Sequence, residues 1–427
     1  LEHPREISWG YQVNGYFAPN SRLGSVEDFK YMINHLHENN IGVILDWVPA
    51  HFDFHEYGLK KFDGSHLFEP HRFNLKYLMS FRNLFLKFSC KHFDFTKKDI
   101  REFLISSAHF WLKEMHIDGL RIDCVSSLMK SEDPQDSTLF LKDLNAVVHK
   151  ECKGAITIAE DFSGDSKILQ ASNIDGLGFD LQWNIPWNYF TRKYFNLHPS
   201  SRQAQYSQLK KALDQINSDN KVSFLSHDET NSNTPNLLKK LKSNSAEWEK
   251  KDWKSLISFL MTSKGKKLLF SGVEFANPTY WNKFIGTNNG IMNDNSELTS
   301  FQKEIQALSS YLNKLYTQEE ALYADTSPTT NWIEDPSNTI HAYRKTSKNS
   351  SVAIFHNFTD ISVSNFKVSI PKKPGIIQSP IEIFSSNDQD FIEDNRKKVA
   401  FSTEVTTDTI TYTIDLPPQT TLIIKEN

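Results

Sequence analysis

Short runs of apolar and β-branched residues alternate, over about the first three quarters of the chain, with longer stretches in which apolar residues recur at helical spacing. Alternation of this kind predicts an α/β architecture built on a parallel sheet. Seven strands are expected, at Gly15 to Pro19, Gly42 to Val48, Leu120 to Val125, Ala155 to Ala159, Phe179 to Trp183, Lys221 to Leu225 and Lys267 to Phe270.

The segments between these strands are expected to be helical. Ser25-Val-Glu-Asp28 has the residues of a capping box, and Phe29, Ile33 and Leu36 follow it at helical spacing. Thr96-Lys-Lys-Asp99 repeats the pattern at the start of a helix over residues 97–116. Further helices are expected near residues 138–151, 203–217, 246–263 and 301–316.

From about residue 325 the pattern changes to short β-type runs separated by Pro, Gly, Asn and Asp. These runs are Thr339 to Arg344, Ser351 to Phe355, Thr409 to Ile414 and Thr420 to Ile424. They predict an antiparallel β-sandwich. Two domains are therefore expected, a barrel-type domain over residues 1–322 and an all-β domain over residues 323–427, with the helix at 301–316 leading from one to the other.

Carboxylates stand at the ends of three of the expected strands, in Asp118-Gly-Leu-Arg-Ile-Asp123, Ile158-Ala-Glu-Asp161 and Leu225-Ser-His-Asp-Glu229. In a (β/α)8 barrel the reacting groups come from the carboxyl ends of different strands, so residues far apart in sequence can share one pocket. Cleaving a glycosidic bond with retention needs two carboxylates about 5–5.5 Å apart. Any one of these strings alone is more simply a helix cap or a surface acid; the three together indicate an enzyme that acts on glycosidic bonds.

The order of motifs along the chain resembles a known family. Asp46-Trp-Val-Pro-Ala-His51, Asp118 to Asp123, Ala159-Glu160 and Ser226-His-Asp-Glu229 are similar to the four signature regions of the α-amylase superfamily of glycoside hydrolases. Within it the chain most resembles the bacterial 1,4-α-glucan (glycogen) branching enzymes, over nearly its whole length. The finer marks are Ser8 to Pro19, Phe62-Asp-Gly64, Gly265 to Phe270, Glu274-Phe275 and Trp281-Asn282.

The resemblance implies a fold and three catalytic residues. The fold is a (β/α)8 TIM-type barrel followed by a C-terminal antiparallel β-sandwich. Asp123 would be the nucleophile, Glu160 the general acid/base and Asp228 the stabiliser of the transition state.

Five further residues are implied to bind the substrate or support the site: Tyr11, Asp46, His51, Arg121 and His227. The two histidines would hydrogen-bond sugar hydroxyls, the tyrosine would stack on the sugar, and Asp46 would support the site. The arginine, two residues before Asp123 on the same strand face, would keep that carboxylate ionised. Taken alone, a histidine is more often a packing residue, and Tyr11 could be ordinary core.

The resemblance also implies that a barrel strand and β-sandwich modules belong before Glu2-His-Pro4. We therefore expect an N-terminally truncated chain in which the barrel lacks its first strand. Such a barrel exposes unpaired backbone edges, which favour instability or association unless something covers them.

Three segments at the expected pocket mouth depart from the family pattern. Asp161-Phe-Ser-Gly164 replaces a second Glu and a nearby Trp, the connection at residues 131–138 is short, and Thr230 to Pro235 differs from the usual run. Because loops on that face set specificity, chain-length preference is less secure than the class of reaction.

Composition removes several other classes of function. The net charge is −4 and no basic run stands out, so no nucleic-acid partner is expected. No stretch of about 18 apolar residues and no leader pattern is present, so no membrane span is expected. Cys90, Cys124 and Cys152 have no CxxC spacing, which argues against a disulfide framework or a zinc site and favours a reducing cytoplasm.

The sequence thus predicts a retaining transglycosylase that cleaves α-1,4-glucan and forms α-1,6 branches in glycogen, without a metal or other cofactor. One alternative is a hydrolase of the same superfamily, of amylase or debranching type, which the catalytic residues alone cannot distinguish. The other is an inactive glucan-binding remnant. The missing strand favours the remnant, whereas the complete set of Asp123, Glu160 and Asp228 favours an enzyme.

Overall fold

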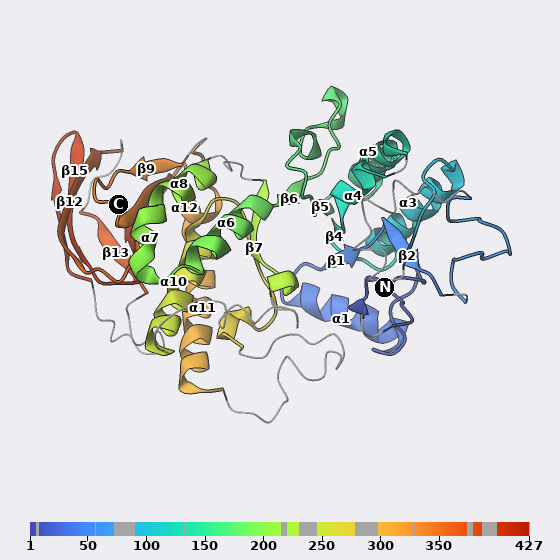
Figure 1. Cartoon of the computed structure of the whole chain (residues 1–427), viewed down its shortest axis with the longest axis horizontal. Coiled ribbons are helices and arrows are strands. Elements are labelled where there is room, and N and C mark those ends of the chain that lie inside the picture. Colours follow the sequence, from blue (N-terminus) through green and yellow to red (C-terminus); the bar gives the residue numbers. More distant parts are fainter. Residues whose placement is uncertain are drawn as a thin grey trace. The chain divides into compact units, whose positions relative to one another are not determined.

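The computed structural model describes residues 1–5, 8–55, 57–71, 90–131, 133–214, 220–229, 246–277, 298–327, 330–373, 379–386 and 399–426. The chain divides into two compact units (Figure 1). The first unit is Leu1–Trp183 with Lys283–Gly286, and the second is Asn184–Asn282 with Thr287–Asn427.

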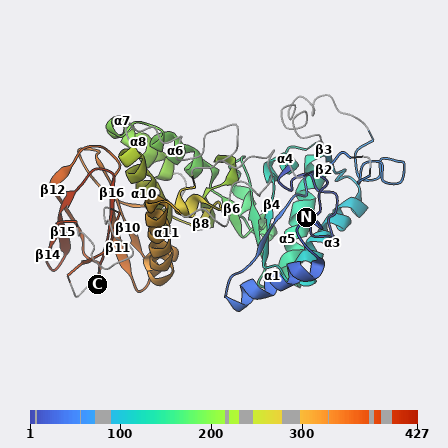
Figure 2. The same cartoon turned by 90° about the horizontal axis from the view of Figure 1, so that it is seen from below.

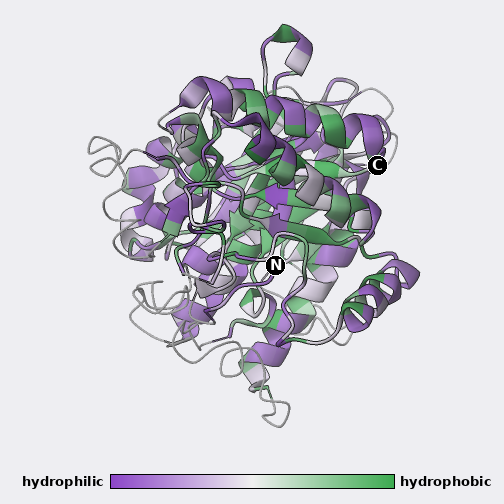
Figure 3. Cartoon of the chain, turned by 90° about the vertical axis from the view of Figure 1, so that its right-hand side faces the viewer, coloured by the Kyte–Doolittle hydropathy of each residue, from purple (hydrophilic) through white to green (hydrophobic). Residues whose placement is uncertain are grey.

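A parallel sheet forms the centre of the first unit. Its strands are β1 (Ile44–Trp47), β4 (Gly119–Ile122), β5 (Ile156–Ala159) and β6 (Leu181–Trp183), paired in that order. Gly119 is required where β4 approaches β5, because a Cβ there would lie 2.6 Å from the carbonyl oxygen of Ile156. Hydrophobic residues follow these strands and hydrophilic residues dominate the surrounding helices, as Figure 3 shows.

The helices of the first unit largely follow the expected pattern. They are α1 (Val26–Glu38), α3 (Lys98–Lys113), α4 (Val125–Met129) and α5 (Pro134–Glu151), with 3-10 turns at Ser166–Ile168 and Ser172–Ile174. The capping box of α1 is confirmed: Ser25 Oγ accepts from Asp28 N at 3.0 Å, and Asp28 Oδ2 accepts from Ser25 N at 2.9 Å. The second capping box is wrong, because the Thr96 hydroxyl donates to Asp94 and the N-cap of α3, Lys97, makes no side-chain cap.

The strand expected at Gly15 to Pro19 is also wrong. This segment forms one isolated antiparallel bridge, between Glu2 and Gly15. Two short strands elsewhere in the unit, β2 (His51–Asp53) and β3 (Cys90–His92), pair with each other. The apolar character of the segment at Gly15 to Pro19 has another cause: the ring of Tyr16 packs on Phe93 and Phe103, at centroid distances of 5.4 and 5.9 Å. The other six expected strands are confirmed by β1, β4, β5, β6, β7 and β8.

The second unit begins with helices and a pair of parallel strands. Strand β7 (Lys221–Leu225) pairs with β8 (Lys266–Leu269). Its longer helices are α6 (Ile185–Phe195), α8 (Tyr206–Asp214), α10 (Ala246–Thr262) and α11 (Ser300–Gln318), and the last three confirm expected helices. The expected end of α8, residues 215–217, lies outside the described residues. Shorter elements are α7 (Pro199–Arg202), α12 (Glu320–Tyr323) and 3-10 turns at Gln203–Gln205, His227–Glu229 and Val273–Phe275.

Two antiparallel sheets complete the second unit, as the sequence predicts. The first has the order β13 (Ile381–Ser385), β16 (Thr420–Lys425), β11 (Ser351–Asn357), β10 (Ile340–Thr346) and β9 (Asn331–Ile333). The second has the order β12 (Val363–Pro371), β15 (Thr409–Leu416) and β14 (Phe401–Val405).

The five-stranded sheet is buried on both faces. Along β11, Phe355 joins the core that the two sheets share, whereas Ile354 joins a second core with residues of α10 and α11. Figure 2 shows these two helices beside β10, β11 and β16. Burial on both faces explains why the run at Ser351 to Phe355 is almost continuously apolar.

Across the part of the chain that the structure describes, no helix combines the length and apolar character needed to cross a lipid bilayer.

A fully buried ion pair connects the helices of the second unit to the sandwich. Arg202 donates from Nη1 and Nη2 to the two carboxylate oxygens of Asp252, at 2.5 and 2.7 Å. Arg202 Nη1 also donates to the carbonyl oxygen of Phe358 at 2.9 Å, and Gln419 Nε2 donates to Asp252. Burial raises the pKa of Asp252, and the arginine opposes that shift.

Asp252→Ala should therefore lower the free energy of unfolding of the second unit by about 3–5 kcal/mol, because it leaves a buried guanidinium without its counter-ion. Chemical denaturation measures the change. Glu247→Ala is the matched control, because its pair with Lys251 lies on the surface of the same helix and contributes little. A loss of less than about 1 kcal/mol in Asp252→Ala would show that the pair is not a main link between these elements.

Candidate active site

The first unit brings two of the predicted catalytic carboxylates together at the carboxyl ends of β4 and β5. Asp123 follows β4 and Glu160 follows β5, and the parallel register sets them level because Ile122 pairs with Ala159. Backbone hydrogen bonds fix both positions: Asp123 N donates to Trp47 O at 3.0 Å, and Glu160 N donates to Ile122 O at 3.1 Å. Both side chains are buried.

One arginine contacts three carboxylates at this point. Arg121 Nη1 donates to Asp46 Oδ1 at 2.6 Å and to Asp123 Oδ1 at 2.7 Å. Its Nη2 lies 2.9 Å from Glu160 Oε2. Because the two terminal nitrogens of one guanidinium contact Asp123 and Glu160, these two carboxylates lie close together.

The residue after Asp123 also holds Glu160. Cys124 has a left-handed backbone conformation, with φ of 55°, and its N–H donates to Glu160 Oε2 at 2.8 Å. The next amide, Val125 N, donates to the carbonyl oxygen of Glu160 at 2.9 Å. Because Oε2 already accepts from two N–H donors, a proton carried by Glu160 belongs on Oε1.

Tyr11, Asp46 and His51 extend the network on the β1 side. Tyr11 Oη donates to Asp46 Oδ2 at 2.8 Å, and His51 Nε2 donates to the carbonyl oxygen of Tyr11 at 3.0 Å. A groove of about 550 Å³ between α1 and β1 is lined in part by Tyr11 and Asp46. Tyr11 is thus a hydrogen-bonding partner within the site as well as a lining residue.

The charges in the network shift several pKa values. Burial would lower the pKa of Arg121, but the three carboxylates outweigh it and keep the pKa well above its usual value. Burial raises the pKa of Asp46 against the effect of Arg121; its side chain is 47% exposed, so water reduces this shift. Burial lowers the pKa of His51, which favours the neutral ring. Burial, with Asp123 and Glu160, raises the pKa of the Cys124 thiol to about 12.

Aromatic rings lie beside the guanidinium of Arg121. The Trp183 ring centroid is 4.5 Å from Cζ, and the Tyr11 ring centroid is 5.8 Å away. Trp183 ends β6 one step beyond the pairing of Ala159 with Gln182, so it is level with Glu160. Sequence reasoning missed this residue, although an aromatic side chain at the carboxyl end of the next expected strand was a usable signal.

The segment after Glu160, where the chain departs from the family pattern, forms a closed turn. Buried Asp161 accepts from Ser163 N at 3.1 Å through Oδ1, and from Gly164 N at 3.1 Å and Gln182 Nε2 at 2.9 Å through Oδ2. Phe162 is left 57% exposed on this turn. The replacement residues therefore build a turn of fixed shape next to Glu160.

The remaining predicted site residues, His227 and Asp228, lie in the second unit, immediately after β7. His227 Nε2 is 3.6 Å from Asp228 Oδ1, and Asp228 N donates to Ser226 Oγ at 3.3 Å. Residues 230–235 and Trp281-Asn282, which the sequence analysis singled out, lie outside the described residues.

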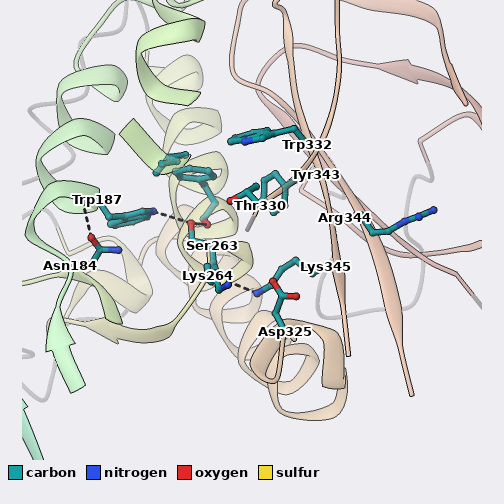
Figure 4. Close-up of a pocket in the computed structure, with 12 residues that line it drawn as sticks. Asn184, Trp187, Ser263, Lys264, Asp325, Thr330, Trp332, Tyr343, Arg344 and Lys345 are labelled. Atoms are coloured by element: carbon teal, nitrogen blue, oxygen red, sulfur yellow. Dashed lines mark hydrogen bonds between the residues drawn. The ribbon is translucent and has the colours of Figure 1, made fainter. Parts of the chain in front are cut away.

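A separate cavity of about 40 Å³ lies within the second unit (Figure 4). Trp187, Trp332 and Tyr343 line it together with Lys264, and Trp187 Nε1 donates to Ser263 Oγ at 3.0 Å. It contains none of the predicted site residues, so it is not the candidate active site.

The chain is similar to a known protein family and to solved structures. A family model described as "Alpha amylase, catalytic domain" matches residues 76–363. A solved Anoxybacillus α-amylase has a TM-score of 0.70 with 16% identity, and the match covers 100% of this chain and 84% of that one. At that identity the likeness establishes the fold.

Two curated relatives have a higher sequence identity to this chain than that solved structure has. The 1,4-alpha-glucan branching enzyme of Methylococcus capsulatus is 34% identical over 407 residues, which cover 90% of this chain and 53% of the relative. That of Fusobacterium nucleatum is 34% identical over 402 residues, covering 92% and 63%. The chain thus spans between about half and two thirds of the length of these relatives.

The Arg121 network predicts a pH-dependent effect on stability. Arg121→Met should cost about 3–5 kcal/mol near pH 7, because Asp46, Asp123 and Glu160 lose their shared cation. Protonation of carboxyl groups at low pH relieves the repulsion among these carboxylates, so the deficit should shrink as the pH falls through about 4, where free carboxylic acids titrate. Thermal unfolding at a series of pH values measures this.

Arg101→Met is the control, because among the described residues Arg101 pairs with one carboxylate, that of Asp136. The stability that this variant loses should be smaller and should change less with pH. An Arg121→Met deficit that stays constant from pH 7 to pH 4 would contradict the electrostatic account.

Proposed function

Because the chain belongs to the α-amylase catalytic-domain family, we propose that it is a retaining 1,4-α-glucan branching enzyme that builds α-1,6 branches in glycogen. The observation that carries the chemistry is the bridge from Arg121 to both Asp123 and Glu160. The branching enzymes that match most of the chain support transfer to a sugar hydroxyl. The substrate is an α-1,4-glucan.

Asp123 is the proposed nucleophile. Arg121 occupies Oδ1, so Oδ2 attacks the anomeric carbon and forms a covalent glycosyl-enzyme. The bond from the anomeric carbon to the bridging oxygen breaks in this step. The adjacent guanidinium favours the ionised carboxylate that the attack requires.

Glu160 is the proposed general acid/base. It gives the proton on Oε1 to the departing oxygen, while Arg121 and the Cys124 amide hold Oε2. In the second half of the reaction Glu160 takes the proton of a 6-hydroxyl, whose oxygen displaces Asp123 and completes the α-1,6 bond. Alternation between the two forms needs a carboxyl group whose surroundings favour neither form strongly.

The other site residues are assigned supporting roles. Asp228 stabilises the positive charge that develops at the transition state, and His51 and His227 hydrogen-bond sugar hydroxyls. Tyr11 offers a ring face to the sugar while its hydroxyl fixes Asp46, and Asp46 in turn holds Arg121.

The proposal extends to the surroundings of the reaction. It uses no metal and no organic cofactor, assigns residues 1–322 to catalysis and 323–427 to the accompanying all-β domain, and places the enzyme in the cytoplasm. The three cysteines are free thiols, in keeping with a reducing compartment.

A hydrolase of the same superfamily would use the same carboxylates, with water in place of the 6-hydroxyl. Incubation with amylose separates the two activities. Branching shifts the iodine stain without a matching rise in reducing ends, whereas hydrolysis weakens the stain and raises the number of reducing ends in step. A stain change fully accounted for by new reducing ends would overturn the proposed transfer.

Asp123→Asn should lower branching activity by at least ~10²–10⁴-fold, because it keeps the shape of the side chain and removes the attacking charge. Asp175→Asn, a change of the same kind at an exposed position of the first unit, should leave activity unchanged. Near-normal activity in Asp123→Asn would exclude it as the nucleophile.

Glu160→Gln should spare substrates with good leaving groups more than natural glucan, since an activated leaving group needs no proton. Rates on an α-glucosyl fluoride and on amylose, compared with wild type, test this. An equal loss on both substrates would argue that Glu160 has a structural role only.

A further inference from the structure

Arg121 is held along one edge but not the other. Its terminal nitrogens reach the carboxylates of Asp46, Asp123 and Glu160, whereas its buried Nε has no hydrogen-bond partner among the described residues. Hydrogen bonds in the guanidinium plane oppose sliding, but they oppose tilting out of that plane weakly. A tilt would move Nη1 and Nη2 in opposite senses and lengthen one carboxylate contact.

The ring of Trp183 can oppose tilting of the Arg121 guanidinium out of its plane. Its ring centroid lies 4.5 Å from Arg121 Cζ, inside the range of a cation–π contact, and tryptophan is the strongest partner for such a contact. The residue is 5% exposed, so the ring also keeps water from the cation. Tyr11, at 5.8 Å, is a more distant second ring.

Trp183 is itself fixed by the sheet. It ends β6, whose Leu181 and Gln182 pair with Ile158 and Ala159 of β5. The strand that carries the ring is therefore paired with the strand that leads into Glu160, and this pairing fixes the backbone position from which the indole extends.

We propose that Trp183 is a positioning residue of the active site, whose ring holds the Arg121 guanidinium in the one orientation that contacts Asp123 and Glu160 together. This inference rests on the proposed function for its effect on catalysis. Its effect on the two carboxyl groups is independent of any substrate.

Loss of this orientation should change the pH dependence of kcat. Catalysis needs Asp123 ionised, which sets the acidic limb of the plot of kcat against pH. It also needs Glu160 protonated, which sets the alkaline limb. If the cation moves away, each carboxylate loses the positive charge that stabilises its ionised form. Both limbs should therefore move to higher pH.

The test compares Trp183→Phe, which keeps an aromatic face, with Trp183→Leu, which keeps only apolar bulk. We expect Trp183→Leu to lower kcat on amylose by about 10- to 100-fold with little change in KM, since small misplacements of a catalytic group have effects of up to about this size. Both limbs of its pH profile should move upward. Trp183→Phe should recover most of the rate and most of the profile.

Trp187→Leu is the matched control, because Trp187 is also a buried tryptophan but belongs to the second unit, where its Nε1 donates to Ser263 Oγ. It should lower thermal stability and leave the limbs of the pH profile in place. Thermal unfolding checks that each variant is folded, and Trp183→Met replaces Trp183→Leu if the leucine variant is not.

A second measurement needs no activity. Carbon-13 NMR titration of side-chain carboxyl groups, with Glu160 identified by its loss in Glu160→Gln, should give a higher pKa for Glu160 in Trp183→Leu than in wild type. If the wild-type chain transfers no glucan, the proposed function fails while this titration still decides the role of Trp183.

Two results would overturn the inference. The first is a folded Trp183→Leu variant whose pH limbs and Glu160 pKa coincide with those of wild type. The second is a rise in KM with unchanged kcat and pH profile, which would make Trp183 a direct contact to the glucan.

Discussion

The site depends on one positive charge, the guanidinium of Arg121, placed among three carboxylates. Asp46, Asp123 and Glu160 all contact this guanidinium, whose positive charge offsets the repulsion among their negative charges. The cation itself tolerates burial only because those carboxylates surround it. The buried cation and the clustered carboxylates therefore stabilise each other, and the position of the arginine sets where the three carboxylates lie.

The parallel sheet provides that geometry. Consecutive parallel strands end at the same edge, and the register of β1, β4 and β5 pairs Asp46 with Arg121 and sets Asp123 level with Glu160. Gly119 allows the close approach of β4 to β5 on which this register depends. Short strands suffice, because each has only to deliver one or two side chains to the edge.

Sequence reasoning succeeded where one local signal decides the structure. The capping residues Ser25 and Asp28 predict the start of α1, and the apolar runs before Asp123 and Glu160 predict β4 and β5. It failed at Gly15 to Pro19, where burial comes from aromatic packing of Tyr16 rather than from strand pairing. It missed Trp183 because the contact with Arg121 joins residues 62 apart in sequence, through a register that no local pattern specifies.

The residue that directly follows the proposed nucleophile is a cysteine, Cys124. Burial, together with Asp123 and Glu160, raises the pKa of its thiol to about 12. The thiol therefore stays protonated and unreactive near neutral pH. The backbone N–H of Cys124 donates a hydrogen bond to Glu160 Oε2 at 2.8 Å. The side chain of Cys124 is thus kept uncharged, while its main chain holds the carboxylate of Glu160 in place.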